Sequence, residues 1–180
     1  MPGAIKILPY YTYEDYVQWE GKWELIDGIP HAMSPAPTPR HQMIANSLGA
    51  LFYLALKNCQ VCKAYQAIDY KLSEDTILQP DISVLCQQTT KKYIDFPPAL
   101  VAEILSASTA VKDRHSKFSL YEQEKIPYYL IVSPDTEVVE VYMLNGNDHY
   151  ELKEQGHDVS FDFYFEYNCS STIEFIEIWK

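Results

Sequence analysis

In the stretch "ALVAEILS", residues 99–106, apolar side chains fill both the odd-numbered and the even-numbered positions, and one acid, Glu103, interrupts them. Successive side chains of a strand point to opposite faces. Such a stretch therefore predicts a strand that is covered by protein on both faces and lies centrally in its sheet. Glu103 shares a face with Val101 and Leu105. Because a buried carboxylate is costly unless another group pairs with it, the stretch also predicts a partner for Glu103.

A second acid stands at the entrance to the preceding apolar run, in "LQPDISVLCQQ" at residues 78–88. In a strand, Asp81 shares a face with Ser83 and Leu85, and it meets Glu103 if the two strands are neighbours. Two such anions repel each other unless a cation joins them or one keeps a proton. A Mg²⁺ ion is often held by one or two carboxylates together with waters. The alternatives are a salt bridge to Arg or Lys, or an acid that reaches solvent from the end of its strand.

The segments on either side predict a mixed α/β (α+β) fold, in which a central sheet is flanked by helices. Asp27-Gly28 predicts a hairpin between two alternating runs, and Thr12 predicts the N-cap of a short helix. Apolar residues at helical spacing predict longer helices over residues 41–57 and 111–124. Further strand-like runs are "VCKAYQAIDYKL", "TILQPDISVL", "YYLIVS", "VVEVYML" and "HYELKE". We expect residues 1–180 to form a single domain.

The helix expected over residues 111–124 brings a lysine toward Glu103. Its core stripe consists of Val111, Phe118 and Tyr121, and the residues that can cap its start are Ser106, Ser108 and Thr109. Asp113 and Lys117 form an i,i+4 pair on the flank of that stripe. A long side chain at this position can reach toward the sheet. The alternative is an ordinary surface ion pair, worth at most about 0.3–0.5 kcal/mol.

Composition limits the classes of protein to which the chain can belong. It has 180 residues, of which 47% are hydrophobic, and a net charge of −11. The hydrophobic content is that of a folded chain rather than a disordered one. The charge argues against a protein whose whole surface binds nucleic acid, because phosphate contacts rest on Lys and Arg. With no apolar run near the ~20 residues of a membrane span and no secretory signal pattern at the start, we expect a soluble cytoplasmic protein.

The four cysteines do not form a recognisable motif in the sequence. Cys59 and Cys62 form a C-x-x-C, whereas Cys86 and Cys169 stand alone. A structural zinc site usually has a second pair of similar spacing. A redox C-x-x-C normally opens a helix after a strand, and this pair is expected to leave a helix and enter a strand. We therefore expect reduced thiols, as is usual in a cytosolic chain.

Five motifs occur together and in order. They are "WELIDG" (23–28), "QPDIS" (79–83), "VAEILSAST" (101–109), "DRHSKFSLY" (113–121) and "IPYYLIVSP" (126–134). With them the chain, from about Tyr13 to Leu144, resembles the Uma-type family of restriction endonucleases, long classed as a domain of unknown function. That family belongs to the restriction-endonuclease-like, PD-(D/E)xK superfamily. The resemblance implies a restriction-endonuclease-like core, with a mixed central sheet flanked by helices and a metal-dependent nuclease site.

The resemblance carries a catalytic site over to this chain residue by residue. Asp81 is the acid of the PD motif, Glu103 is the second acid, and Glu24 is the upstream acid. Asp81 and Glu103 would hold one Mg²⁺ or Mn²⁺ for hydrolysis of a phosphodiester bond. The superfamily has a lysine two residues after the second acid, and Leu105 stands there in this chain. Lys117, on the following helix, is expected to act in its place.

Polar residues around these motifs are candidates for binding the substrate. They are Arg40, His41, Ser108, Thr109 and Asp113, and further candidates for phosphate contact are Lys91, Lys92, Lys112 and Arg114. Asp113 is also expected to hold Lys117 in place. The implied activity is that of a Mg²⁺-dependent endodeoxyribonuclease. We expect it to bind DNA weakly and with a strong dependence on salt, because the acidic chain repels the phosphates.

Two other classes of function remain open. A nuclease fold that has lost catalysis could serve as a binding or assembly module; its mark would be a broken acidic pair, whereas this pair is intact. An unrelated metal-dependent hydrolase would need histidine ligands, but the five histidines show no H-x-x-x-H or H-E-x-x-H spacing. The tail "SSTIEFIEIWK", residues 170–180, predicts an edge strand or short helix docked on the core. It is also a candidate contact for a homodimer, by analogy with other nuclease folds.

Overall fold

The computed structural model describes residues 9–33, 37–106 and 113–180. Within these residues, the main sheet has six strands in the order β10-β9-β8-β7-β6-β3. Their bounds are β3 Lys63–Gln66, β6 Ile82–Leu85, β7 Leu100–Ile104, β8 Tyr128–Ser133, β9 Val138–Leu144 and β10 Tyr150–Gly156. Strand β7 pairs antiparallel with β6 and parallel with β8, and all five of its residues are buried. The prediction of a central strand covered on both faces is confirmed.

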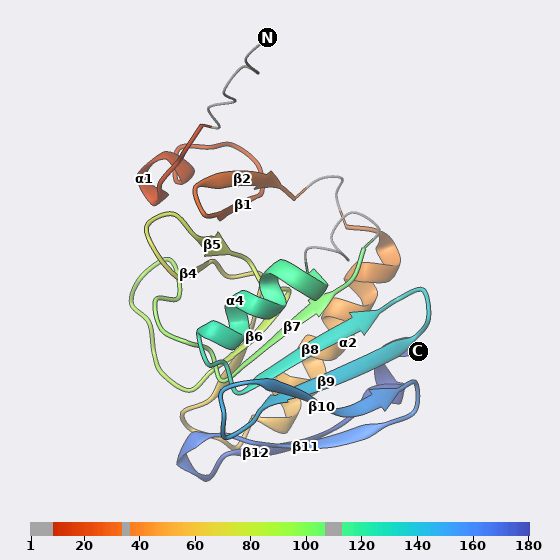
Figure 1. Cartoon of the computed structure of the whole chain (residues 1–180). Helices are drawn as coiled ribbons and strands as arrows, with labels where there is room; N and C mark the ends of the chain where they lie inside the picture. Colours follow the sequence, from red (N-terminus) through yellow and green to blue (C-terminus); the bar gives the residue numbers. More distant parts are fainter. Residues whose placement is uncertain (1–8, 34–36, 107–112) are drawn as a thin grey trace.

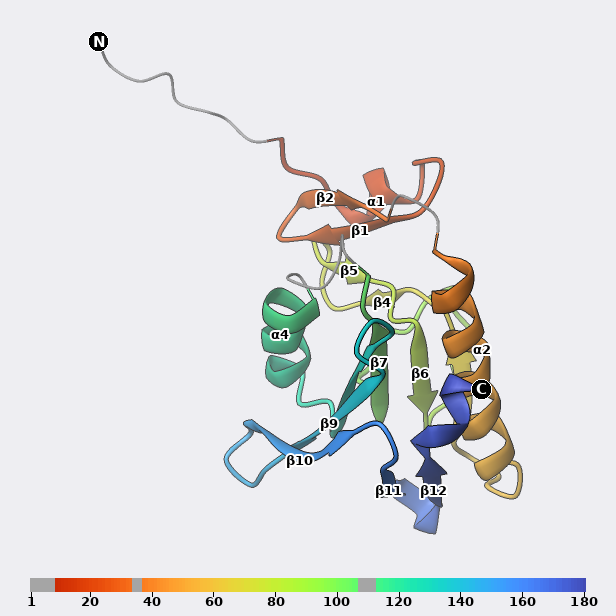
Figure 2. The same cartoon turned by 90° about the vertical axis from the view of Figure 1, so that its right-hand side faces the viewer.

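Helices cover the two faces of this sheet (Figures 1 and 2). Helix α2, Pro39–Ala55, lies on one face, and helix α4, Phe118–Gln123, lies on the other. The helix predicted over residues 41–57 is confirmed. It begins at Pro39 because Thr38 caps it, accepting a hydrogen bond from the backbone N–H of His41 at 3.2 Å, and because proline suits the first turn of a helix.

Strand parity divides the core into two parts. Leu100, Ala102 and Ile104 pack on the side of α2, whereas Val101 packs with the side chains from α4. Glu103 has the parity of Val101, so its carboxylate faces α4. The face assigned to Glu103 by alternation along the sequence is therefore confirmed.

The second predicted helix differs from expectation at its start. Asp113–Lys117 forms a π-helix, η1, which continues directly into α4. Ion pairs of Arg114 and Lys117 anchor this wider turn to the sheet. Hydrophobic spacing reports only which side of a helix faces the core, so it cannot reveal this local change in pitch. Single π-turns occur frequently at functional sites.

A smaller, four-stranded sheet precedes β6 in the chain through its strand β5. Its strand order is β2-β1-β5-β4. Its bounds are β1 Trp23–Ile26, β2 Ile29–Ala32, β4 Tyr70–Lys71 and β5 Ile77–Leu78. The predicted hairpin is confirmed: Asp27 and Gly28 have φ of 50° and 73°, as a two-residue turn of type I′ requires. The predicted short helix is α1, Tyr13–Tyr16, and the carboxylate of Asp15 accepts the backbone N–H of its N-cap Thr12 at 2.9 Å.

The C-terminal segment packs against the chain's own core. It contains β11 Ser160–Tyr164, the 3₁₀ turn η2 Glu166–Asn168, β12 Ser170–Glu174 and the 3₁₀ turn η3 Phe175–Trp179. The buried side chains of Ile173, Phe175, Ile178 and Trp179 belong to the same core as α2. The tail was predicted to be an edge strand or a short helix docked on the core, and it forms a strand followed by a 3₁₀ turn. Its buried apolar side chains are not available to a partner.

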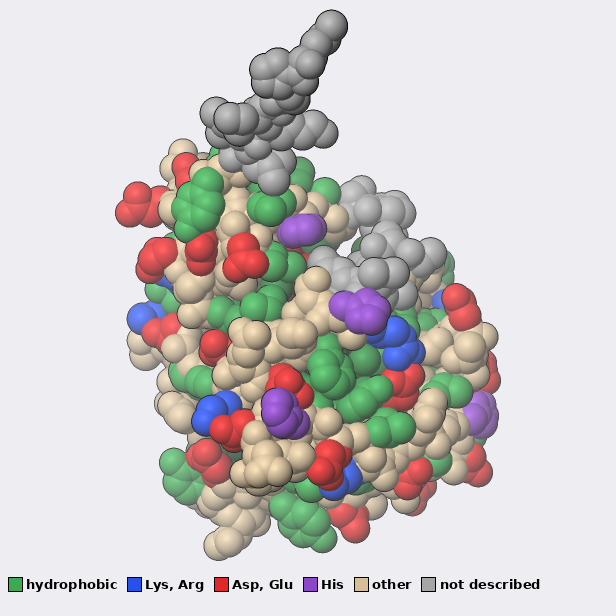
Figure 3. All heavy atoms as spheres, in the orientation of Figure 1, with side chains coloured by type: hydrophobic (Ala, Val, Ile, Leu, Met, Phe, Trp, Pro, Cys, Tyr) green, Lys and Arg blue, Asp and Glu red, His purple; other side chains and the backbone are tan. Residues whose placement is uncertain are grey.

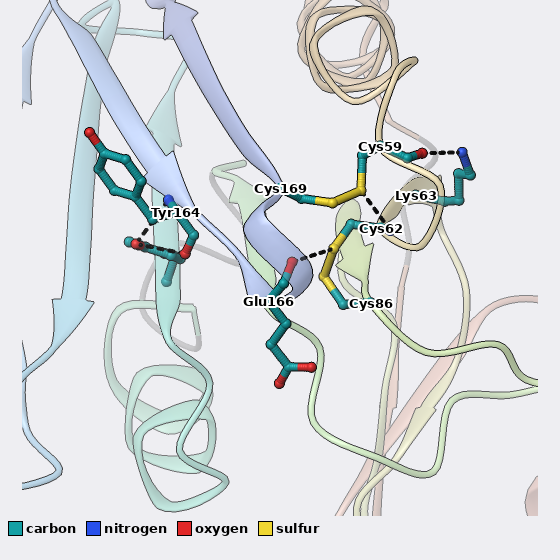
Figure 4. Close-up of a disulfide and its surroundings, with 8 residues drawn as sticks. Cys59, Cys62, Lys63, Cys86, Tyr164, Glu166 and Cys169 are labelled. Atoms are coloured by element: carbon teal, nitrogen blue, oxygen red, sulfur yellow. Dashed lines mark hydrogen bonds between the residues drawn. A yellow bond between two sulfur atoms is a disulfide. The ribbon is translucent and has the colours of Figure 1, made fainter.

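All four cysteines lie in the described part of the chain, and all four are paired (Figure 4). Cys59 is bonded to Cys169 and Cys62 to Cys86. The expectation of reduced thiols is therefore wrong for this structure. The partners are 110 and 24 residues apart in the chain, and only the docking of the C-terminal hairpin and the pairing of β3 with β6 bring them together.

No helix among the described residues is long and apolar enough to cross a membrane.

Candidate active site

The two acids singled out in the sequence lie on neighbouring strands. In the β6–β7 pair, Ile82 stands opposite Ala102 and Ser83 opposite Val101. Continuing this antiparallel register by one residue places Asp81 opposite Glu103. Directly opposed residues have Cβ atoms about 4.5–5.5 Å apart. The condition set for convergence of the two carboxylates, that their strands be neighbours, is therefore met.

Glu103 is buried and receives hydrogen bonds from two side chains of the adjoining helical segment. Its Oε1 atom accepts from Lys117 Nζ at 2.8 Å and from the Tyr121 hydroxyl at 2.7 Å. Lys117 and Tyr121 are four residues apart, and both reach Glu103 from the same side. The side chain of Lys117 is only 2% exposed, so the alternative of an ordinary surface lysine does not hold.

The same ammonium group also binds an acid from the smaller sheet. Lys117 Nζ lies 2.6 Å from Oε1 of Glu24, whose side chain is fully buried in β1. The same oxygen accepts the backbone N–H of Gln79 at 3.0 Å. Lys117 therefore joins an acid of the N-terminal hairpin to an acid of the central strand, and it ties the two sheets together at this point.

Asp81 is the most open of the three acids, with a side chain 22% exposed. Its Oδ2 atom accepts the backbone N–H of Ile104 at 2.8 Å and lies 3.3 Å from His41 Nε2. These contacts hold the carboxylate at the junction of β6 and β7, beside the first turn of α2. His41 was a candidate for contact with phosphate, and the structure buries it next to Asp81.

This set of groups fits a hard divalent cation. Glu24, Asp81 and Glu103 offer oxygen ligands of the kind that Mg²⁺ and Mn²⁺ prefer. When all three are ionised, their charge exceeds that of Lys117 by two. The exposed part of Asp81 gives an approach from solvent. The chemistry of these side chains therefore suits a Mg²⁺ or Mn²⁺ ion, which Asp81 and Glu103 could hold.

Other candidates from the sequence lie elsewhere or outside the described residues. The Arg40 guanidinium is ion-paired with Glu137 and donates to the carbonyl of Trp179, so it points toward the C-terminal segment. Lys91 is paired with Asp95 in the loop between β6 and β7. Residues 107–112, which include Ser108, Thr109 and Lys112, lie outside the described part, as does the side chain of Asp113.

Three groups of the site were missed in the sequence. Tyr121 was assigned only to the core stripe, although its spacing from Lys117 was a usable signal. The backbone N–H groups of Gln79 and Ile104 left no signal, because donors of this kind exist at every residue except proline. Burial, followed by the charge of Glu103, raises the pKa of the Tyr121 phenol well above its ordinary value, so this hydroxyl remains a donor at neutral pH.

We predict that Tyr121→Phe lowers the free energy of unfolding by about 1.5–3 kcal/mol, the range for a hydrogen bond to a charged group. The buried Glu103 oxygen loses one donor, and the aromatic ring that packs on Tyr129 is kept. Urea denaturation at neutral pH measures the change. Tyr150→Phe is the matched control: its hydroxyl binds the neutral carbonyl of Ile126, so it should cost about 1 kcal/mol. Equal losses in the two variants would contradict a charged acceptor.

A second ion pair fastens η1 to the sheet. Arg114 donates two hydrogen bonds to Glu140 of β9, at 2.7 and 2.9 Å, and the Tyr142 hydroxyl donates a third at 2.6 Å. Burial raises the pKa of Glu140, but the hydrogen bonds from Arg114 and Tyr142 outweigh it and leave the pKa below its ordinary value of 4.5. The network thus holds the turn that carries Lys117.

We predict that Glu140→Gln removes part of the acid sensitivity of folding. A lowered carboxyl pKa stabilises the fold above the unfolded value of 4.5, and this contribution is lost as pH falls through the lower folded pKa. Because Arg114 is 37% exposed, we expect a loss of only roughly 1 kcal/mol at pH 7. Urea denaturation as a function of pH should show a flatter profile below about pH 5 for the variant. An unchanged profile would assign the acid sensitivity to other carboxylates.

Comparisons with known proteins identify the family and the fold. Residues 13–163 match the Uma2 family, described as "Putative restriction endonuclease". The uncharacterized protein slr1290 of Synechocystis sp. (strain ATCC 27184 / PCC 6803 / Kazusa) is 32% identical over 148 residues, covering 77% of each chain. A crystal structure described as a putative nuclease belonging to DUF820, from Anabaena variabilis ATCC 29413, shares the fold, with a TM-score of 0.75 and 16% identity over 93% of this chain and 97% of the other. The predicted fold class is thereby confirmed, and the chain belongs to the Uma2 family.

Proposed function

We propose that the protein is a metal-dependent endonuclease that hydrolyses phosphodiester bonds of DNA. The observation that carries this proposal is the buried Lys117 ammonium bound to both Glu24 and Glu103, with Asp81 on the neighbouring strand. An ordinary structural ion pair needs one acid for one lysine. Here two acids share one lysine and a third, Asp81, lies on the neighbouring strand, which suits the binding of a further cation, and the family to which the chain belongs is described in terms of nuclease chemistry.

The residues of the site have separate roles in this proposal. Asp81 and Glu103 would hold Mg²⁺ or Mn²⁺, and the bound ion would polarise the scissile phosphate and lower the pKa of a coordinated water. Lys117 would orient the attacking water and offset the negative charge that develops on the phosphate. Tyr121 and Glu24 would position Glu103 and Lys117 through the hydrogen bond and ion pair described above. His41, beside Asp81, would contact the phosphate at the open side of the site.

The surface supports weak binding of DNA. On the face drawn in Figure 3, basic side chains lie singly beside acidic ones rather than in a continuous basic area. Together with the net charge of −11, this predicts a weak affinity, because few phosphates can be neutralised at once. We further propose that the protein acts in the cytoplasm, and that a homodimer would supply the two sites needed to cut both strands of a duplex.

A catalytically inactive binding or assembly module is the second candidate. The observation in its favour is that Lys117 already contacts two of the three acids directly. In a relic of a nuclease, such an internal ion pair would simply replace the metal. The two proposals differ in two measurable properties, because only the enzyme binds a divalent ion at Asp81 and cleaves DNA.

A cleavage screen tests the proposal. Supercoiled plasmid, linear duplex and single-stranded DNA are incubated at low salt with Mg²⁺, Mn²⁺ or EDTA. We expect nicked or linear plasmid with either metal and none with EDTA, and the ratio of linear to nicked product reports on paired sites. Wild-type protein that leaves every substrate intact in both metals would support the inactive module instead.

A further inference from the structure

The four cysteines come from distant parts of the chain and meet at one place (Figure 4). Cys59 lies in the loop after α2, and Cys62 lies immediately before β3. The β3–β6 register places Lys63 opposite Leu85, so Cys62 faces Cys86, to which it is bonded. Cys169 enters from the C-terminal hairpin and is bonded to Cys59. The Sγ atoms of Cys59, Cys62 and Cys169 all lie within 4.8 Å of one another.

The surroundings of Cys59 favour a thiolate at its sulfur atom. The backbone N–H of Cys62 points at Sγ of Cys59, at 3.0 Å. A hydrogen bond of this kind stabilises a negatively charged sulfur and orients it as a ligand. Lys63 adds a positive charge nearby, because its Nζ atom binds the carbonyl of Cys59 at 2.8 Å. Cys62, Cys86 and Cys169 are buried, whereas Cys59 is partly exposed, which leaves an entry path for an ion.

We propose that in the reduced protein these four cysteines form a tetrathiolate site for one Zn²⁺ ion. Zinc in structural sites takes four sulfur ligands at about 2.3 Å, which sets the sulfur atoms about 3.8 Å apart. Three of them already lie within 4.8 Å of one another, and reduction of the Cys59–Cys169 bond lets its two sulfur atoms separate to that spacing. A change of side-chain rotamer at Cys86 brings in the fourth once its bond to Cys62 is reduced. In a reducing compartment, such a cluster of cysteines is more often a metal site than a set of disulfides.

The proposal requires a defined change of redox state. Reduction of the two disulfides takes up four electrons and four protons. A thiol reductant supplies both, whereas a phosphine supplies the electrons and is oxidised to the phosphine oxide, with water supplying the oxygen atom and the protons. Binding of Zn²⁺ then displaces the four thiol protons, so each sulfur binds the metal as a thiolate. The ion would tie the end of α2, strands β3 and β6 and the C-terminal hairpin to one another. Asp81 and Cys86 lie at opposite ends of β6, so the site is structural and independent of the proposed nuclease function.

The test uses the full chain, reduced with a phosphine, freed of metal and titrated anaerobically with Co²⁺ as a spectroscopic substitute for Zn²⁺. We expect a thiolate-to-cobalt charge-transfer band and the visible absorption of tetrahedral cobalt, both saturating at one equivalent. Zn²⁺ should abolish both signals by displacement and should raise the melting temperature. Cys86→Ser and Cys169→Ser should each weaken Co²⁺ binding by at least about 100-fold.

Two controls keep the outcome clear. Asp81→Asn should leave the charge-transfer band unchanged, because carboxylates do not produce it, and this separates the site from the acidic cluster. The second control is wild-type protein itself, whose charge-transfer band tests the proposal even if a cysteine variant fails to fold. Reduced wild-type protein with four titratable thiols but no charge-transfer band would overturn the proposal and leave the cysteines as disulfides alone. Unchanged Co²⁺ affinity in Cys86→Ser would equally overturn a site made of four cysteines.

Discussion

Lys117→Met should lower the free energy of unfolding by about 3–5 kcal/mol in metal-free buffer, the usual cost of removing one partner from a buried ion pair. The substitution keeps most of the length and the apolar stem of the side chain. It leaves the carboxylates of Glu24 and Glu103 buried without their shared ammonium. Urea denaturation at pH 7 in EDTA measures the loss.

Lys125→Met is the matched control for this variant. Lys125 also forms a close ion pair, at 2.6 Å from Asp148, but both side chains are more than half exposed. The same substitution there should change stability by no more than about 1 kcal/mol. If the two variants were equally stable, Lys117 would not be neutralising buried acids, and the electrostatic account of the site would fail.

A divalent ion should restore much of what Lys117→Met loses. With two carboxylates released, Mg²⁺ or Mn²⁺ supplies the missing positive charge, so the metal should raise the melting temperature more in the variant than in wild type. Any DNA cleavage should nevertheless fall by about 10²-fold or more, because the group that stabilises charge on the phosphate is gone. A variant that cleaves at the parental rate would remove Lys117 from the mechanism.

Leu105→Lys in the Lys117→Met background tests the relocated lysine directly. Residue 105 follows β7 on the same face as Glu103, and its side chain packs in the core on the α4 side. A lysine there returns an ammonium group to the position usual in the superfamily. We expect partial recovery of cleavage, and of stability in EDTA, relative to the single variant. If neither cleavage nor stability recovered, a lysine could fill this role only from the helix.

Much of the fold could be predicted because its signals are local. Strand parity in residues 99–106, a two-residue turn at Asp27-Gly28 and helical spacing after Thr38 each depend on a few neighbouring side chains. The disulfides and the π-turn at Asp113–Lys117 could not be predicted. They depend on contacts between segments far apart in the chain, which leave no periodic pattern behind.

The residues that form the site could be predicted to a similar extent. Strand parity assigned each acid to a face of its own strand, and the two could meet only if the strands were neighbours, which the structure shows. Helix phase brought Lys117 toward Glu103. The position of Lys117 around the helix axis also suggested that it lies at the edge of the buried face. Replacing a lysine at such an edge would change the stability of the fold only slightly. The docking of the N-terminal hairpin, which buries Glu24 against the lysine, converts that edge into a closed site. The degree of burial, and with it the energy of the interaction, therefore came only from the structure.

Asp81→Asn should abolish the rise in melting temperature that Mg²⁺ or Mn²⁺ causes, and it should lower any cleavage of DNA by at least about 10²-fold. In EDTA the variant should be as stable as wild type to within about 1 kcal/mol. An amide oxygen can still accept the backbone N–H of Ile104, which Asp81 accepts at 2.8 Å. The substitution also relieves repulsion from Glu103 on the next strand. Thermal melts with and without metal give both results.

Asp69→Asn provides the matched control for the loss of a carboxylate charge. Asp69 accepts hydrogen bonds from Gln79 at 2.8 Å and from Tyr16 at 3.1 Å, and an amide there should leave the metal-induced shift in place. A shift retained in Asp81→Asn would put the ion at other ligands. A large loss of stability in EDTA would instead mean that Asp81 serves mainly as the partner of a protonated His41, 3.3 Å away. In the proposed site the neighbour of Asp81 that matters is Glu103, since the two acids repel each other until a cation lies between them.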